Sequence, residues 1–317
     1  MSQSSRAKSL KAALCALPLL LGVAALPARA DTNDAAKPKP ILVQGSMNVF
    51  RRFPVEDRPK MVEFYDKVLA LKPLTPINLS PNQQMLLFAV GTGQIKLAAG
   101  LNNREYHPGG AIGDATGIRI YTLTYPDEAQ VKARFKDAGY PEPVFKAIGG
   151  GRKAALVKDP AGFSIGLVIA PGAETDGVEA GINVSNLERS RAFYRDFEGL
   201  EELPPVKDPI LGVTKYPFRH GQTTISLFKI GNNLPRDTGS AGIQYVISNI
   251  DAMNARALAE HVTVETPLGG LQGFPGLKTV WLNDPDGVTD YFYQLDPSAR
   301  RGRATASTGA PGGAAAK

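Results

Sequence analysis

The chain contains an internal duplication, and this feature constrains its fold more than any other. The run Val55-Glu56-Asp57 returns 129 residues later as Val184-Ser185-Asn186. A second motif, Asp159-Pro160-Ala161-Gly162, returns as Asp284-Pro285-Asp286-Gly287 with an offset of 125 residues. A self-similarity of this length exceeds the unit of a solenoid repeat and fits a duplicated domain. We therefore expect two related copies in one chain.

The repeat divides the chain into two domains, residues 43–171 and 177–296. Each has about 125 residues, enough to bury a core of its own. We interpret residues 31–42 as a polar linker and residues 172–176 as a hinge. Residues 297–317 are rich in Ala, Gly, Ser and Thr and cannot bury enough apolar surface to fold, so we expect a disordered tail.

Residues 1–30 have the pattern of a secretory signal peptide. A basic start precedes an apolar stretch from Ala12 to Leu26, and Ala28-Arg29-Ala30 forms a small-x-small cleavage site. A membrane anchor is the weaker alternative, because a spanning helix needs roughly 20 apolar residues. We predict a periplasmic or secreted protein whose mature chain has no membrane span. Cys15 is the only cysteine, so the mature chain has no thiol nucleophile, disulfide or Cys-based zinc site.

The formal net charge of +6 comes largely from the two ends of the chain. Four basic residues lie within residues 1–30 and four more within residues 297–317, so the remaining body is close to −2. The body shows no dense basic stripe of the kind that binds a phosphate backbone. We therefore expect no nucleic-acid partner.

Each copy repeats a smaller pattern of one strand, one helix and three strands, which gives four units in the chain. The first helix carries an apolar stripe at i, i+3, i+4 and i+7, made by Met61, Phe64, Tyr65 and Val68. Short extended runs follow it, such as Met85 to Val90. The mixture of strands and helices indicates the α+β class.

These motifs resemble the vicinal oxygen chelate superfamily, which includes glyoxalase I, bleomycin-resistance proteins and extradiol dioxygenases. The resemblance rests on a strand ending in Val-x-Asp, a helix carrying Phe-Tyr and a closing Asp-Pro-x-Gly hairpin, and it covers about residues 43–296. It implies an α+β fold of two tandem domains. Each would consist of two βαβββ units that form a cupped mixed sheet, with the ligand inside the cup.

The resemblance also implies where a metal would bind. Metal-dependent members take His, Gln or Glu from the first strands of the units and Glu from the last strand. In the first domain these positions hold Phe50, Ile120 (or Ile118 in the alternative register) and Gly166, so we expect a cup that binds no metal. In the second they hold Glu179, either Gly242 or Gln244, and Tyr291.

The second domain is therefore the predicted site. Strand alternation places Glu179 and Asn183 on one face, and Tyr291 and Tyr293 on one face of the last strand. The candidate ligand-binding residues are Glu179, Asn183, Gln244, Tyr291 and Tyr293. No residue is assigned a catalytic role, and no cofactor is expected, with a divalent metal at Glu179 as the weaker alternative.

Three functions stay open at this point. The first is binding of a small organic molecule in the second cup without a metal. The second is a metal-dependent lyase or dioxygenase that uses Glu179, and the third is a structural or interaction protein whose cups are filled by side chains. The three histidines lie outside the ligand positions, which argues against a 2-His-1-carboxylate iron site. Whether the protein is an enzyme, and which oligomer it forms, are also open.

Overall fold

The computed structural model of the chain describes residues 42–80, 83–101, 110–173, 177–237, 240–271 and 274–295. All of these residues belong to one compact unit. The predicted signal peptide and the predicted tail lie outside the described residues. Within the described part, no helix is long and apolar enough to cross a membrane.

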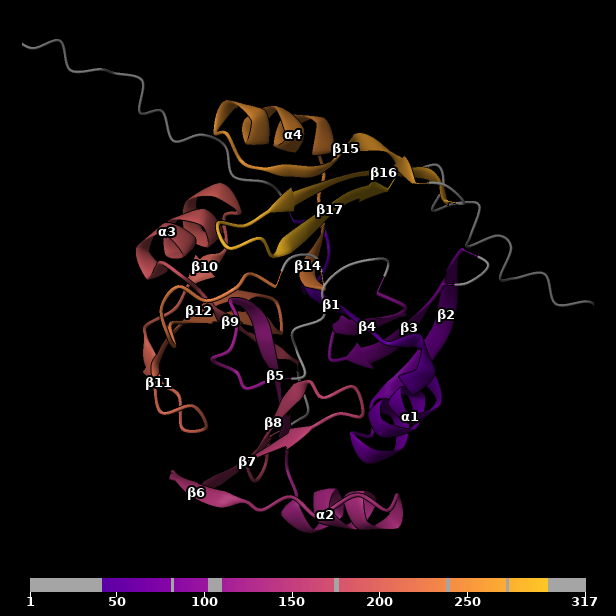
Figure 1. Ribbon diagram of the computed structural model, residues 1–317, viewed down its shortest axis with the longest axis vertical. Coiled ribbons are helices and arrows are strands. Elements are labelled where there is room, and N and C mark those ends of the chain that lie inside the picture. The colour runs from indigo at the N-terminus through magenta and orange to yellow at the C-terminus, as the bar shows by residue number, and fades with distance from the viewer. Residues whose placement is uncertain are drawn as a thin grey trace, which may run out of the picture. The chain divides into compact units, whose positions relative to one another are not determined.

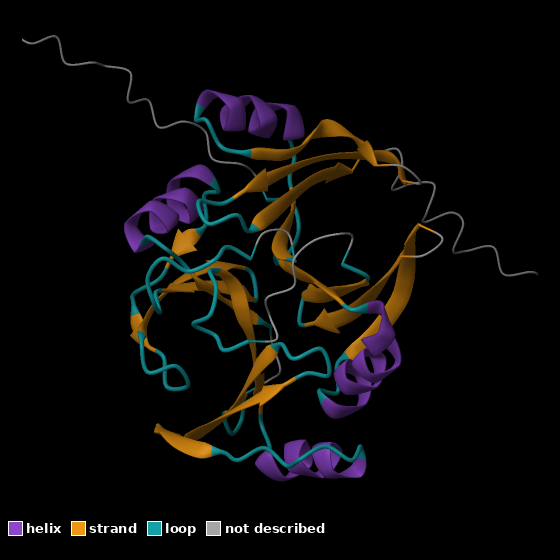
Figure 2. Cartoon of the chain, viewed as in Figure 1, coloured by secondary structure: helices purple, strands orange, loops and turns teal. Residues whose placement is uncertain are grey.

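Four units of one strand, one helix and further strands follow one another along the chain (Figures 1 and 2). The first contains β1 (Asn48–Phe53), α1 (Arg58–Glu63) with a π-helical turn (Phe64–Val68), β2 (Lys72–Ser80), β3 (Gln83–Val90) and β4 (Gly93–Ala99). The second contains β5 (Gly117–Tyr125), α2 (Glu128–Asp137), β6 (Lys146–Gly149), β7 (Arg152–Lys158) and β8 (Ser164–Ile169).

The second half repeats this order. The third unit contains β9 (Glu179–Asn183), α3 (Leu187–Ala192) with a π-helical turn (Phe193–Phe197), β10 (Glu201–Glu202), β11 (Val206–Lys207), β12 (Thr214–His220) and β13 (Thr223–Phe228). The fourth contains β14 (Ala241–Val246), α4 (Ile250–Ala259), β15 (Val264–Leu271), β16 (Phe274–Asn283) and β17 (Thr289–Leu295). The predicted α+β class and its four units are confirmed.

The strands form two curved mixed sheets. Sheet A has the order β15-β16-β17-β14-β1-β4-β3-β2, and sheet B has the order β10-β12-β13-β9-β5-β8-β7-β6, with β11 paired to β12. Figure 1 shows β1 beside β14, and β5 beside β9. Sheet A therefore joins the first and fourth units, and sheet B joins the second and third.

The expectation that each half of the sequence closes a cup of its own is wrong. The two joints are antiparallel pairs of first strands, with Phe50 opposite Gly242 in sheet A and Ile120 opposite Gly181 in sheet B. Backbone hydrogen bonds make these joints. They can form between any two first strands, so the motif spacing within one half does not decide which units pair.

The two recurring motifs contact each other within each half. The Asp159 carboxylate accepts hydrogen bonds from two backbone N–H groups of its own hairpin turn and one from the Tyr65 hydroxyl at 3.0 Å. Asp284 and Tyr194 repeat the arrangement, with a hydroxyl–carboxylate distance of 2.9 Å. The prediction that the two Asp-Pro hairpins are equivalent is confirmed, and the contact explains why both motifs were duplicated together.

The buried polar groups near these contacts differ between the halves. In the first half, Asp159 forms a fully buried ion pair with Arg51. In the second half, Glu198 and Asp290 are buried together, and the Tyr245 hydroxyl donates to Glu198. Burial raises the pKa of Glu198 to about 8. Burial and the negative charge of Glu198 also raise the pKa of Asp290, so the pair retains a proton at neutral pH.

Candidate functional site

A cavity of about 270 Å³ lies in the cup of sheet A. Every strand of the sheet contributes at least one residue to its wall. Among these residues are three of the predicted ligand-binding residues, Gln244, Tyr291 and Tyr293. The cup that the first and fourth units share is therefore the candidate site.

One wall of the cavity is aromatic. Tyr291 makes edge-to-face contacts with Phe50 at 5.1 Å and with Trp281 at 4.9 Å between ring centroids. The Trp281 indole N–H donates to the Thr279 hydroxyl at 2.9 Å, which fixes the ring in its plane. Interlocked rings of this kind form a rigid apolar surface for a flat ligand.

The floor of the cavity is polar and lies on the central strands β14, β1 and β4. The Lys96 ammonium donates to the side-chain oxygen of Gln244, which also accepts from the Asn48 amide at 3.1 Å. The backbone oxygen of Gln244 accepts from the Gln44 side chain at 3.0 Å. These contacts hold Gln244 in place and direct Lys96 to the middle of the cup.

The cavity carries a positive charge. Desolvation lowers the pKa of Lys96 from its ordinary value of 10.5 to about 8, which leaves most of the side chain protonated at pH 7. Arg52 is a second lining cation and is 6% exposed, and its guanidinium carbon lies 5.4 Å from the centre of the Phe50 ring. The cavity wall, as far as the structure describes it, contains no carboxylate. The described lining of this cavity therefore has a net positive charge.

The residues in this cup do not fit a divalent metal. In register, Phe50 lies beside Lys96, and Gln244 lies beside Tyr291. A catalytic metal site commonly takes three imidazole or carboxylate donors, whereas this set offers one amide oxygen and an ammonium group that repels cations. No cluster of three or more His, Cys, Asp or Glu side chains with metal-binding geometry occurs in the described ranges.

Glu179 and Asn183 lie in the other cup, so the predicted grouping of all five residues is wrong. Glu179 forms an ion pair with Lys215 at 2.5 Å, and Lys215 also contacts Asp208 at 3.1 Å. The Asn183 side chain exchanges hydrogen bonds with the backbone N–H and carbonyl of Ile230. Both predicted residues therefore have structural partners, and pairing across the halves separates them from Gln244.

Side chains lie close to Gly166 in sheet B. A Cβ atom added there would lie 2.9 Å from the Thr122 hydroxyl and 3.0 Å from the Ile210 side chain. A Cβ atom on Gly181 would lie 2.5 Å from Ile120. Ile120 and Gly166 do share a cup, as predicted for the first domain, but Phe50 lies in the cup of sheet A.

Lys96 is a site residue that no sequence motif marks. Lys96 lies on β4, the last strand of a unit whose hairpin has no Asp-Pro-x-Gly motif, so the motif spacing does not reach it. One signal in the sequence was available, because Lys96 is a charged residue between the apolar residues Ile95 and Leu97. Strand alternation places it on the face opposite those two core residues.

Comparisons with solved structures support the architecture. Glyoxalase I from Zea mays superposes with a TM-score of 0.63 at 16% sequence identity, covering 84% of this chain and 97% of that protein. A Bacillus subtilis protein named as a candidate dioxygenase gives a TM-score of 0.56 at 16% identity, covering 82% and 87% of the two chains. No protein-family model and no curated protein matches the sequence. The likeness covers both sheets, and it shows that this chain has the vicinal oxygen chelate fold.

Proposed function

We propose that the protein binds a small organic anion with a flat apolar body in the cup of sheet A, without a metal. The observation that supports this is the combination, in one cavity of about 270 Å³, of an aromatic wall with two cations and no described carboxylate. The volume is slightly below the range of roughly 300–1,000 Å³ that is usual for drug-sized ligands. It suits a compact ligand such as an aromatic carboxylate.

Each lining group has a defined part in this proposal. The Lys96 ammonium would donate to the anionic group of the ligand, and the Phe50, Trp281 and Tyr291 rings would contact its flat body. Burial raises the pKa of Tyr293, which keeps its hydroxyl protonated as a donor. A charge-assisted hydrogen bond of this kind contributes about 1.5–3 kcal/mol, so Lys96 is the residue on which affinity depends most.

The other two predicted functions have less support. A lyase or dioxygenase built on Glu179 would need this residue in an open cup, and it is paired with Lys215. The cavity in sheet A does not fit a structural protein whose two cups are both filled by side chains. Export remains part of the proposal on the sequence of residues 1–30 alone, and N-terminal sequencing of the mature protein tests it.

Native mass spectrometry of the purified protein would show a co-purifying molecule, and calorimetry would then compare defined probes. We expect benzoate to bind more tightly than neutral benzamide or cationic benzylamine. The Lys96→Met variant should lose roughly 10- to 150-fold in affinity for benzoate. Lys278→Met is the matched control, because Lys278 lies on β16 of the same sheet with an exposed side chain. Equal affinity for benzoate and benzamide would refute the proposal.

A further inference from the structure

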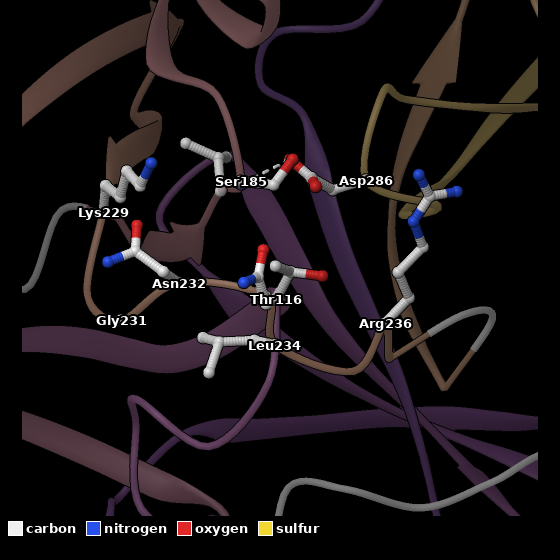
Figure 3. A pocket seen from close by; sticks show the side chains of 10 residues that line it. Thr116, Ser185, Lys229, Gly231, Asn232, Leu234, Arg236 and Asp286 are labelled. Carbon is white, nitrogen blue, oxygen red and sulfur yellow. Dashed lines mark hydrogen bonds between the residues drawn. The ribbon is translucent and has the colours of Figure 1, made fainter.

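A second cavity, of about 230 Å³, lies outside both cups. It is bounded by the loop between β13 and β14, by the residues that directly follow β9, and by the β16–β17 hairpin (Figure 3). Most of the side chains that line it are polar, among them Thr116, Asn232 and Asp286. None of these belongs to the site in sheet A.

Two buried polar atoms in this cavity lack a hydrogen-bond partner among the described residues. Asp286 has no exposed surface, and one of its carboxylate oxygens accepts from the backbone N–H of Ser185 at 3.0 Å, while the other accepts nothing. Thr116 is 2% exposed, and its buried hydroxyl also has no hydrogen-bond partner among the described residues. Leaving such a group unpaired costs about 1–3 kcal/mol, so both atoms indicate a missing donor.

The internal repeat shows that the hairpin does not require the Asp286 carboxylate. In the first half, Ala161 occupies the equivalent position. That hairpin closes with a hydrogen bond from Gly162 N–H to the Asp159 carbonyl at 2.8 Å, and the second closes in the same way between Gly287 and Asp284 at 3.1 Å. The unpaired oxygen of Asp286 is therefore an addition to the common fold.

Two positively charged side chains also line the cavity. Lys229 and Arg236 are both exposed, and Figure 3 shows them on either side of Asp286. The same cavity therefore has a negative group and two positive groups in its lining. The carboxylate of Asp286 is buried, and the Lys229 ammonium and the Arg236 guanidinium are exposed. A ligand that matches it carries a cationic donor and an anionic group.

We infer that this cavity binds a small zwitterion of the α-amino-acid class. The ligand ammonium would donate to the free oxygen of Asp286 and to the Thr116 hydroxyl, and its carboxylate would face Lys229 and Arg236. The inference does not depend on the proposed function of sheet A, because the two cavities share no residue.

Calorimetry with L-serine as the probe tests this site. Acetate, methylamine and glucose serve as the anionic, cationic and uncharged comparisons, and each should bind at least tenfold more weakly than L-serine. The Asp286→Asn variant keeps an oxygen for the Ser185 N–H but loses the charge, and we expect it to bind L-serine roughly 10- to 150-fold more weakly. Thr116→Val, of similar shape, should weaken binding to a smaller extent.

Three results would overturn the inference. These are no binding of L-serine to the wild-type protein at millimolar concentrations, equal affinity for glucose, and unchanged affinity in Asp286→Asn. Circular dichroism checks that the variant folds, and Asp286→Ala, which copies Ala161, provides a second variant if it does not. Lys96→Met should bind L-serine normally, so failure of the sheet A proposal is recognised separately by the benzoate measurements.

Discussion

Replacing Lys96 by methionine should stabilise the fold at neutral pH while it weakens the proposed binding of benzoate. Each pKa unit corresponds to about 1.4 kcal/mol, and burial lowers the pKa of Lys96 from 10.5 to about 8. Holding the charged side chain in the cup therefore costs the folded protein about 3 kcal/mol at pH 7. Methionine has a similar length and no charge. Gln244 still accepts from Asn48 after the change, so no buried acceptor is left unpaired.

The stability difference should depend on pH in a defined direction. Between pH 8 and 10.5 the unfolded chain keeps the Lys96 proton and the folded chain has released it. The stability of the wild type therefore rises relative to the variant by about 1.4 kcal/mol per pH unit in this window. The full advantage of the variant is present below pH 8 and disappears near pH 10.5.

Urea unfolding followed by circular dichroism at pH 7, 8, 9 and 10 measures this difference. Both proteins experience the same titration of the other lysines and tyrosines, so comparing them isolates Lys96. A variant that is less stable than the wild type at pH 7 would contradict the reasoning. A difference that is equal at all four pH values would contradict it as well, since the penalty would then not come from the charge.

Three further changes test the polar contacts of the two halves. Burial raises the pKa of Glu198 to about 8, so as the pH rises the unfolded chain loses this proton at a lower pH than the folded chain. The unfolding free energy should therefore fall by about 1.4 kcal/mol per pH unit between pH 4.5 and pH 8. In Glu198→Gln, urea unfolding should show a smaller decrease of the unfolding free energy with pH. The same pH dependence as in the wild type would show that the pair with Asp290 holds no proton. Asp159→Asn removes the negative charge from the fully buried pair with Arg51 and should lower the unfolding free energy by about 3–5 kcal/mol, and a loss under 1 kcal/mol would refute the buried pair. Glu179→Gln should leave benzoate affinity unchanged in calorimetry, since this residue lies in sheet B, and a tenfold loss would move the site there.

The sequence by itself determined the units and the faces of their strands. The Phe-Tyr and Asp-Pro-x-Gly motifs recur because Tyr65 binds Asp159 and Tyr194 binds Asp284, a contact that needs both motifs in every copy. Alternation along a strand is a local property of the backbone. It was therefore sufficient to place Tyr291 and Tyr293 on the cup face.

Only the tertiary structure decided which units share a cup. The joint between β1 and β14 is made by backbone hydrogen bonds, which carry no signature in the side chains. As a result the sequence grouped Glu179 with Gln244, although they line different sheets.

The chemistry of the site depends on the same long-range pairing. Lys96 and Gln244 are 148 residues apart and meet because β4, β1 and β14 are neighbours in sheet A. The low pKa of Lys96 arises from the surfaces that these strands bury around it. Desolvation is a property of the assembled cup, so no local pattern around Lys96 could have predicted it.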